Sequence, residues 1–345
     1  MVEWTARHRL SFRSLPIRTT QAPIKIPMNL ILPVDSRVND TQGFITLDLE
    51  TGEQTEFPTQ ESFPFLRQGF RGGVLVENCL YVCNSFSVKA YAIEKIASKY
   101  HFSLMWQLQQ PEWLVGKAAN ADLHALYYDK ARNTLLLANS FMDSVDEISL
   151  DGQLLQRKHL WEISEHVRKL VRLRNPNAAD LCHLNHISMH FGQTFLTLGN
   201  LNISGKGAVL HAESGEFVIE DLQRPHDGVF WQNEFWITET SAYRLRVYDN
   251  ILHVDDFKQA SYRTIDLSSC VNENNQFWCR GLYVDKNYVY LGCSQFQDRL
   301  NDMSTQPPSH ILQIDKATGA IIKRFDIPGS PALRRPVLFS MLAYD

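Results

Sequence analysis

Four patterns that would assign a function at once are missing from this sequence. The six cysteines include no CxxC pair, which argues against a structural zinc site of the finger type and against a disulfide-dense secreted scaffold. No run of 18 apolar residues is present, so no membrane-spanning segment is expected. The glycines form no phosphate-binding spacing ahead of a helix. A net charge of −4 argues against nucleic acid as a partner. We therefore expect buried thiols and a cytoplasmic protein with neither a membrane nor a nucleic-acid partner.

What the sequence does contain is a repeat. A unit of four apolar, strand-like segments recurs, with Gly, Asn, Asp or Lys in the turns between them. One copy starts with RGGVLVE followed by CLYVCNS, and others start with HALYYD, HISMHFG, HDGVFWQ and RGLYVDK. The first strands begin at residues 71, 124, 186, 226 and 280. Repeats of four strands at this spacing are typical of β-propeller blades.

The segments left over at the two ends of the chain supply a sixth unit. The C-terminal LFSMLAYD is expected to form its innermost strand, and residues 29–36, 43–52 and 53–57 its other three. The sequence thus predicts an all-β fold, a six-bladed β-propeller whose last blade is closed by N- and C-terminal strands. The predicted organisation is an N-terminal arm over residues 1–28 and a single propeller domain over residues 29–345.

Three motifs resemble those of a family of bacterial β-propeller proteins that carries a domain of unknown function. They are HLNHI (residues 183–187), RPHDG (residues 224–228) and WCRGL (residues 278–282), and the likeness covers most of the chain from about residue 70 onward. The resemblance implies the propeller fold and marks these positions, but it implies no particular reaction.

Propeller topology brings the start of each first strand and the end of each second strand to the same face. The residues at the starts are Arg71, His124, His186, His226 with Asp227, and Arg280. Those at the ends are Asn84, Asn139, Asn200, Glu239 and Ser294. The opposite ends of these strands contain ordinary turn residues. The asymmetry predicts a polar site at one end of the central channel.

Two kinds of chemistry suit these residue types. Imidazoles from successive blades can hold one divalent transition metal (Fe, Mn or Zn), and the predicted ligands are His124, His186 and His226. Without a metal, the same histidines can act as general acid or base, with Asp227 orienting one of them. Each histidine can equally serve only to cap a strand through hydrogen bonds to loops.

The predicted ligand is a small anionic molecule. The guanidinium groups of Arg71 and Arg280 suit a carboxylate or phosphate, and Asn84, Asn139, Asn200 and Glu239 are the further candidate substrate contacts. The alternative role of the two arginines is to pair with neighbouring acids and hold blades together.

The sequence therefore favours an enzyme of lyase, hydrolase or oxygenase type with His124, His186, His226 and Asp227 as candidate catalytic residues. The alternative is a non-catalytic propeller that binds a ligand or peptide. Insertions near residues 111–123, 159–185 and 296–309 emerge on the same face. In the second, Trp161, Ile163 and Val167 are spaced as one helical face, which predicts either a lid or a helix that covers the blade ends.

Overall fold

The computed structural model describes residues 29–36, 41–59, 69–96, 99–109, 122–173, 180–201, 206–270, 277–295, 308–330, 333 and 336–344. The predicted N-terminal arm and most of the insertions near residues 111–123 and 296–309 lie outside these residues. Among the described residues, neither α-helix has the length and apolarity needed to cross a membrane.

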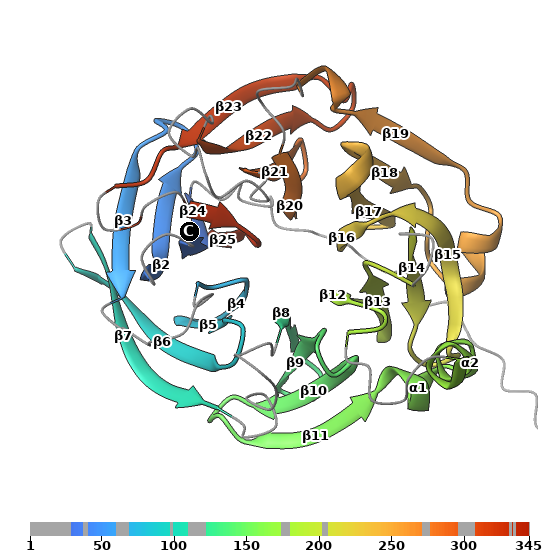
Figure 1. Cartoon of the computed structure of the whole chain (residues 1–345). Helices are drawn as coiled ribbons and strands as arrows, with labels where there is room; N and C mark the ends of the chain where they lie inside the picture. Colours follow the sequence, from blue (N-terminus) through green and yellow to red (C-terminus); the bar gives the residue numbers. More distant parts are fainter. Residues whose placement is uncertain are drawn as a thin grey trace, which may run out of the picture.

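The described strands form six antiparallel sheets arranged in a ring around a central channel, so the predicted six-bladed β-propeller is confirmed (Figure 1). Blade 1 contains β4 (Gly72–Val76), β5 (Cys79–Cys83), β6 (Val88–Ile96) and β7 (Lys99–Leu108). Blade 2 contains β8 (Leu123–Asp129), β9 (Thr134–Asn139), β10 (Ser144–Ser149) and β11 (Leu154–His159). Blade 3 contains β12 (Leu184–His190), β13 (Gln193–Leu198), β14 (Lys206–His211) and β15 (Glu216–Gln223).

The remaining blades follow the same order from the channel outward. Blade 4 contains β16 (Pro225–Trp231), β17 (Glu234–Glu239), β18 (Arg244–Tyr248) and β19 (Tyr262–Asp266), with short 3-10 helices at Thr240–Ala242, Val254–Lys258 and Ser268–Cys270. Blade 5 contains β20 (Phe277–Val284), β21 (Tyr288–Gln295), β22 (Ser309–Asp315) and β23 (Ile321–Ile327).

Blade 6 joins the two ends of the chain, as predicted. Its outer strands are β1 (Asn29–Ser36), β2 (Thr41–Asp48) and β3 (Gln54–Thr59). Its innermost position is shared by two short C-terminal strands, β24 (Pro336–Leu338) and β25 (Leu342–Tyr344), which both pair with β1. Ser294 of blade 5 secures this closure, because its Oγ donates to Leu338 O and accepts from Leu338 N, at 2.8 Å each.

Apolar side chains fill the spaces between blades. The buried residues form six clusters, and each joins two neighbouring blades around the ring. Strand β9 is buried along its whole length, whereas in the outermost strand β7 only Tyr100 is buried and the other residues are half-buried or exposed. The burial pattern follows from the architecture, because inner strands are covered on both faces and edge strands face water on one side.

The predicted helix forms, but it does not cover the channel. Helices α1 (Leu160–Ile163) and α2 (Glu165–Leu173) follow β11 and lie at the outer rim of the ring (Figure 1). Leu160 and Val167 are fully buried in the cluster between blades 2 and 3. Ser164 Oγ donates to Gly215 O at 2.6 Å. The helical segment therefore seals two blades together at their outer ends.

Candidate functional site

Four successive inner strands carry a β-bulge near their first residues. In each case the innermost strand has one or two residues that pair with no residue of the second strand. The paired residues on either side of the gap are Leu123 and Ala125 in blade 2, Leu184 and His186 in blade 3, Pro225 and Gly228 in blade 4, and Cys279 and Leu282 in blade 5. The residues left out of the pairing are His124, Asn185, His226 with Asp227, and Arg280 with Gly281. A bulge bends its strand and redirects a side chain. These polar residues therefore occupy equivalent positions in blades 2 to 5.

Three histidine rings converge at this end of the channel. The ring centroid of His124 lies 4.8 Å from that of His183 and 6.0 Å from that of His226. His124 and His226 are each 4% exposed, whereas the side chain of His183 is 30% exposed. The cluster is thus buried on the side of blades 2 and 4 and open beside His183.

Hydrogen bonds set the tautomers of His124 and His183. His124 Nδ1 lies 3.0 Å from the carbonyl oxygen of Asp122, and His183 Nδ1 lies 2.8 Å from Oδ1 of Asp180. Carbonyl and carboxylate oxygens only accept hydrogen bonds, so we assign a proton to Nδ1 in both rings. Each ring is then left with a lone pair on Nε2.

The third ring is held by the residue that follows it. His226 Nδ1 lies 3.1 Å from Oδ2 of Asp227, which also accepts a hydrogen bond of 3.0 Å from the backbone N–H of Gly281 in blade 5. Nε2 of His226 is buried and has no hydrogen-bond partner among the described residues. An unpartnered basic nitrogen inside a protein is costly, and such atoms are found where a ligand binds or a reaction occurs.

The surroundings keep the rings of His124 and His226 neutral. Burial lowers the pKa of His226 to about 4, although Asp227 opposes part of this shift. Burial, followed by the electrostatic influence of His183 and Arg71, holds the pKa of His124 well below its ordinary value. Burial alone would raise the pKa of Asp227, but His226 and other neighbours lower it overall, so this carboxylate is ionised. At neutral pH the site therefore presents imidazole lone pairs beside a fixed carboxylate.

Arg280 is held against two aromatic rings. Its guanidinium carbon lies 3.7 Å from the ring centroid of Trp278 and 4.7 Å from that of Phe339. Phe339 belongs to the link between β24 and β25, and its ring centroid is also 5.9 Å from that of His226. The closing C-terminal segment therefore supplies one wall of the site.

Arg71 takes a different position from Arg280. Its Nη1 forms an ion pair with Oδ1 of Asp122, which is 23% exposed. Its guanidinium carbon lies 5.5 Å from the ring centroid of Phe339. The ion pair joins blade 1 to the start of blade 2, which is the structural role considered for Arg71 from the sequence.

A cavity of about 340 Å³ opens beside the rings. Its lining comes from blades 3, 4 and 5 and includes Asp180, His183, Asn185, Arg224, His226 and Arg280. Asn185 Nδ2 donates to Pro225 O at 2.8 Å, and Asn185 Oδ1 is buried without a hydrogen-bond partner among the described residues. The residues that precede β12 and β16, His183 and Arg224, have left-handed φ values of 52° and 46°.

His183, rather than the predicted His186, completes the ring cluster. Among the described residues, no ring contact joins His186 to His124 or His226, whereas the charge of Asp227 acts on it. The bulge at Asn185 explains the difference, because one extra residue changes the face to which each following side chain points. The repeat aligns His124 with Asn185, and His186 lies one position farther along the strand.

The same correction applies to the predicted metal ligands. One ligand atom each from Asp122, His124 and His183 lies within 4.8 Å of the others, and the described part of the chain holds no other such group of three. Of the predicted ligands His124, His186 and His226, only His124 belongs to it.

Most of the predicted substrate contacts at the ends of the second strands form hydrogen bonds within the protein. Asn84 Oδ1 accepts from Phe86 N and Ser87 N, and Asn139 Oδ1 accepts from Met142 N, so both side chains hold turns. Asn200 is exposed and lines the cavity.

Glu239 is buried among arginines. Arg246 binds it with both Nε and Nη2, at 2.6 and 2.9 Å, and Arg244 Nε adds a contact of 2.5 Å. Its Oε1 also accepts from Gln223 N at 2.8 Å. These partners fix Glu239 within blade 4 and join it to the end of β15 in blade 3.

Several residues that lie at the site in the structure were not among the site residues predicted from the sequence. Asp122, His183 and Asn185 flank the predicted positions, and Trp278 and Phe339 were assigned to packing or to the closing strand. His183 and Asn185 lie in the HLNHI motif, and Trp278 opens WCRGL. The motifs were therefore the available signal for these three residues.

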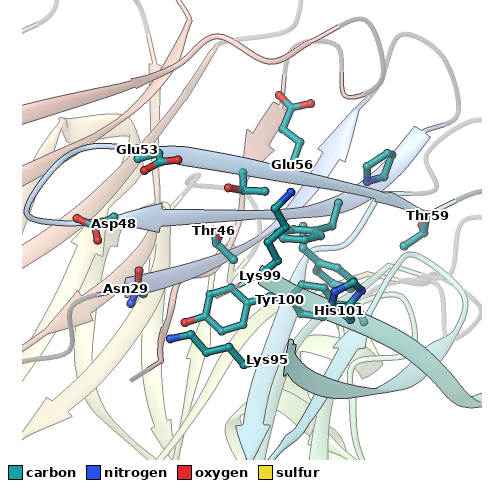
Figure 2. Close-up of a pocket in the computed structure, with 15 residues that line it drawn as sticks. Asn29, Thr46, Asp48, Glu53, Glu56, Thr59, Lys95, Lys99, Tyr100 and His101 are labelled. Carbon is teal, nitrogen blue, oxygen red and sulfur yellow. The ribbon is translucent and has the colours of Figure 1, made fainter. Parts of the chain in front are cut away.

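A larger hollow of about 940 Å³ lies at the outside of the ring, between β3 of blade 6 and β7 of blade 1 (Figure 2). Its labelled acids Asp48, Glu53 and Glu56 come from blade 6, and its labelled bases Lys95, Lys99 and His101 come from blade 1 (Figure 2). Asp48 Oδ1 is occupied by the N–H groups of Glu50 and Thr51, and Lys95 lies over the ring of Tyr100 at 5.2 Å. Because these groups are engaged locally, the smaller cavity beside the histidines is the better candidate site.

Comparison with known proteins places the chain by its fold. No protein-family model and no curated protein matches it. A protein of unknown function from Bacteroides caccae is 12% identical, with a TM-score of 0.59 over 92% of this chain and 98% of that one. The periplasmic gluconolactonase of Pseudomonas aeruginosa is 14% identical, with a TM-score of 0.55 over 92% and 99%. A chain of the nidogen/laminin complex is 11% identical, with a TM-score of 0.54 over 92% and 98%. At these identities, the chain is similar to an enzyme and to a member of a binding complex in fold alone.

Proposed function

We propose that the protein is an enzyme that binds a small anionic molecule in the cavity of about 340 Å³ beside the histidine rings, called here the channel-mouth cavity, and transfers a proton through His226. The observation that carries the proposal is the state of this ring. His226 lines the cavity, Asp227 holds its Nδ1, and its buried Nε2 has no hydrogen-bond partner among the described residues. A ring held in this way offers a directed basic nitrogen, as general acid–base catalysis requires.

Arg280 is the proposed anchor for the anion. A guanidinium group recognises carboxylate or phosphate with two parallel hydrogen bonds, and the stacking on Trp278 limits the orientations it can adopt. The exposed Arg224 lies at the rim of the same cavity and adds positive charge. The two guanidinium groups at one cavity are the basis on which we propose an anionic substrate.

The cavity also indicates which other groups the substrate carries. Asn185 Oδ1 and His226 Nε2 are two acceptor atoms without partners among the described residues. Each would be satisfied by a hydroxyl hydrogen of the ligand. A hydroxylated anion, such as a hydroxycarboxylate or a sugar phosphate, therefore fits the site better than a simple fatty acid.

The second candidate function is ligand binding without a reaction. The low pKa of His226, about 4, favours it, because a weak base abstracts protons poorly unless the bound ligand raises that pKa. The enzyme and the complex member found among the structural neighbours do not separate the two functions.

One experiment separates these functions. Wild-type protein is screened by thermal shift against a panel of hydroxycarboxylates and sugar phosphates, and compounds that stabilise it are incubated with it and followed by proton NMR. His226→Gln and Arg280→Gln are compared with the controls His101→Gln and Arg132→Gln, which change exposed residues outside the cavity.

The enzyme proposal expects Arg280→Gln to abolish stabilisation and His226→Gln to abolish conversion while some binding remains. Binding by the wild type without any conversion would assign the binding function instead. If no member of the panel binds, or if all four variants behave alike, both functions are refuted for this ligand class.

A further inference from the structure

We infer that Asp122, His124 and His183 form a binding site for a first-row divalent transition metal at the edge of the cavity. The inference concerns the site proposed above but does not depend on catalysis there. The three residues converge from the starts of blades 2 and 3, and one ligand atom of each already lies within 4.8 Å of the others. Ligands about 2.1 Å from a tetrahedral ion lie about 3.4 Å apart, so small side-chain rotations would complete the site.

The hydrogen bonds of the two histidines match those of metal ligands. A metal-binding imidazole characteristically donates its other ring N–H to a carbonyl or carboxylate, which orients the ring. His124 makes this contact with the carbonyl oxygen of Asp122, at 3.0 Å, and His183 makes it with Asp180, at 2.8 Å. Both rings therefore have Nε2 available as a ligand atom without losing their existing partners.

Asp122 can supply the third ligand while it remains paired with Arg71. The ion pair is made through Oδ1 of the carboxylate, and Oδ2 is the oxygen that we assign to the metal. A carboxylate oxygen accepts more than one contact, so Arg71 would orient Asp122 toward the ion. This assigns Arg71 a positioning role.

The charge balance also permits a cation. Three carboxylates, those of Asp122, Asp180 and Asp227, lie beside the rings and offset the guanidinium groups of Arg71, Arg224 and Arg280. A site without net charge can take a divalent ion together with an anionic ligand. Two histidines and one carboxylate are typical ligands of zinc and of non-haem iron, whereas calcium and magnesium prefer sites made entirely of oxygen.

The position of the three residues leaves room for a ligand on the ion. His183 lines the cavity, and the side chains of His183 and Asp122 are 30% and 23% exposed. Three protein ligands with open coordination positions are characteristic of catalytic rather than structural metal sites. A metal bound here would hold an oxygen atom of the anion that Arg280 binds.

The test is metal binding by the full chain, purified without a histidine tag and treated with a chelator. Zn²⁺ is titrated calorimetrically, and Co²⁺ is added as a spectroscopic probe of the ligand geometry. The variants are Asp122→Asn and His183→Asn, and His101→Asn on the outer strand β7 is the matched control. Asparagine tolerates the left-handed φ of 52° at His183, so that variant keeps the backbone conformation.

We expect one Zn²⁺ per chain in the wild type and in His101→Asn, with a d–d absorption spectrum on Co²⁺ binding. Loss of an outer-shell partner alone typically weakens metal binding about 10–100-fold, so loss of a ligand in either site variant should weaken it by at least about 100-fold. Melting curves identify a variant that fails to fold, and the other variant then carries the comparison.

Absence of saturable binding, or equal affinity in the wild type and a folded site variant, would overturn the inference. Conversion of an anion by protein that binds no Zn²⁺ would also overturn the metal site, but it would leave the proposed enzymatic function intact. Metal binding without conversion of any anion would support the metal site and refute the proposed enzymatic function.

Discussion

The imidazole of His226 and the carboxylate of Asp227 are adjacent in sequence and hydrogen-bonded to each other, with 3.1 Å between Nδ1 and Oδ2. In a regular strand, consecutive side chains point to opposite faces. The bulge in β16 leaves both residues out of the pairing with β17 and so permits the contact. The same carboxylate accepts from Gly281 N in the next blade, so one residue orients the proposed base and links blades 4 and 5.

Replacement of Asp227 by asparagine should disturb both the orientation of the His226 ring and the link between blades 4 and 5. The ring of His226 would lose its ionic acceptor, and its proton would be distributed between Nδ1 and Nε2. The lost charged hydrogen bond to Gly281 should lower the free energy of unfolding by roughly 1–3 kcal/mol. Long-range ¹H–¹⁵N NMR of the imidazole measures the tautomer, and urea titration measures the stability. An unchanged Nδ1–H signal in the variant would show that Asp227 does not orient the ring.

Acidification should destabilise the protein through His226. The folded pKa is about 4 and the ordinary value is 6.5, so the unfolded chain binds the proton first as the pH falls. The contribution is present in full above pH 6.5 and is lost between pH 6.5 and about 4. His310, with a pKa also lowered to about 4, acts in the same sense. Burial raises the pKa of Asp143 to about 7, and this group acts in the opposite sense.

The variant His226→Gln isolates the contribution of His226. The difference in unfolding free energy between wild type and variant, measured by urea titration at pH 7.5 and at pH 4.5, should shift against the wild type at the lower pH. Each pKa unit corresponds to about 1.4 kcal/mol. A difference that does not depend on pH would contradict the low pKa of His226.

Glu239 should prove structural. The substitution Glu239→Gln removes the charge that Arg244 and Arg246 share inside blade 4. Breaking a buried ion pair from one side costs about 3–5 kcal/mol, so a large fall in melting temperature is expected. Anion binding, measured by calorimetric titration below the melting transition of the variant, should persist. Loss of binding in a folded variant would return Glu239 to the list of substrate contacts.

Phe339 should matter to both stability and binding. It is buried at the channel end of the closing segment, and its ring contacts Arg280, Arg71 and His226. Phe339→Ala should cost about 3–5 kcal/mol of unfolding free energy and weaken anion binding, because Arg280 loses one of its two aromatic supports. Phe339→Leu, which fills most of the volume but lacks the ring face, should restore more of the stability than of the binding. Equal recovery of both would argue that the ring only fills space.

The number and order of the blades were predictable from sequence because every blade needs the same pattern of residues. Four short apolar strands separated by Gly, Asn and Asp turns must stack on their neighbours, and this pattern survives in segments such as TLLLAN and EFWITE. The closure by both chain ends followed from the strands that remained once five units had been assigned. Its division into β24 and β25 was not visible in the sequence.

The site was predicted only in part, for local reasons. The bulges insert residues that no hydrophobic pattern reveals, so the alignment of repeats selected His186 where the structure uses His183 and Asn185. Glu239 occupied a position equivalent to that of site residues, but the arginines on β18 that bind it could be recognised only once strand register was known. The helix after β11 had a clear amphipathic pattern, yet its position at the outer rim depends on contacts with blade 3.

The most direct measurement is a crystal structure of the protein with the anion that stabilises it most in the thermal-shift screen. We predict that the anion occupies the cavity between blades 3, 4 and 5, with its charged group on Arg280 and a hydroxyl group on Nε2 of His226. A ligand bound in the outer groove between β3 and β7, with the channel-mouth cavity holding only water, would contradict it.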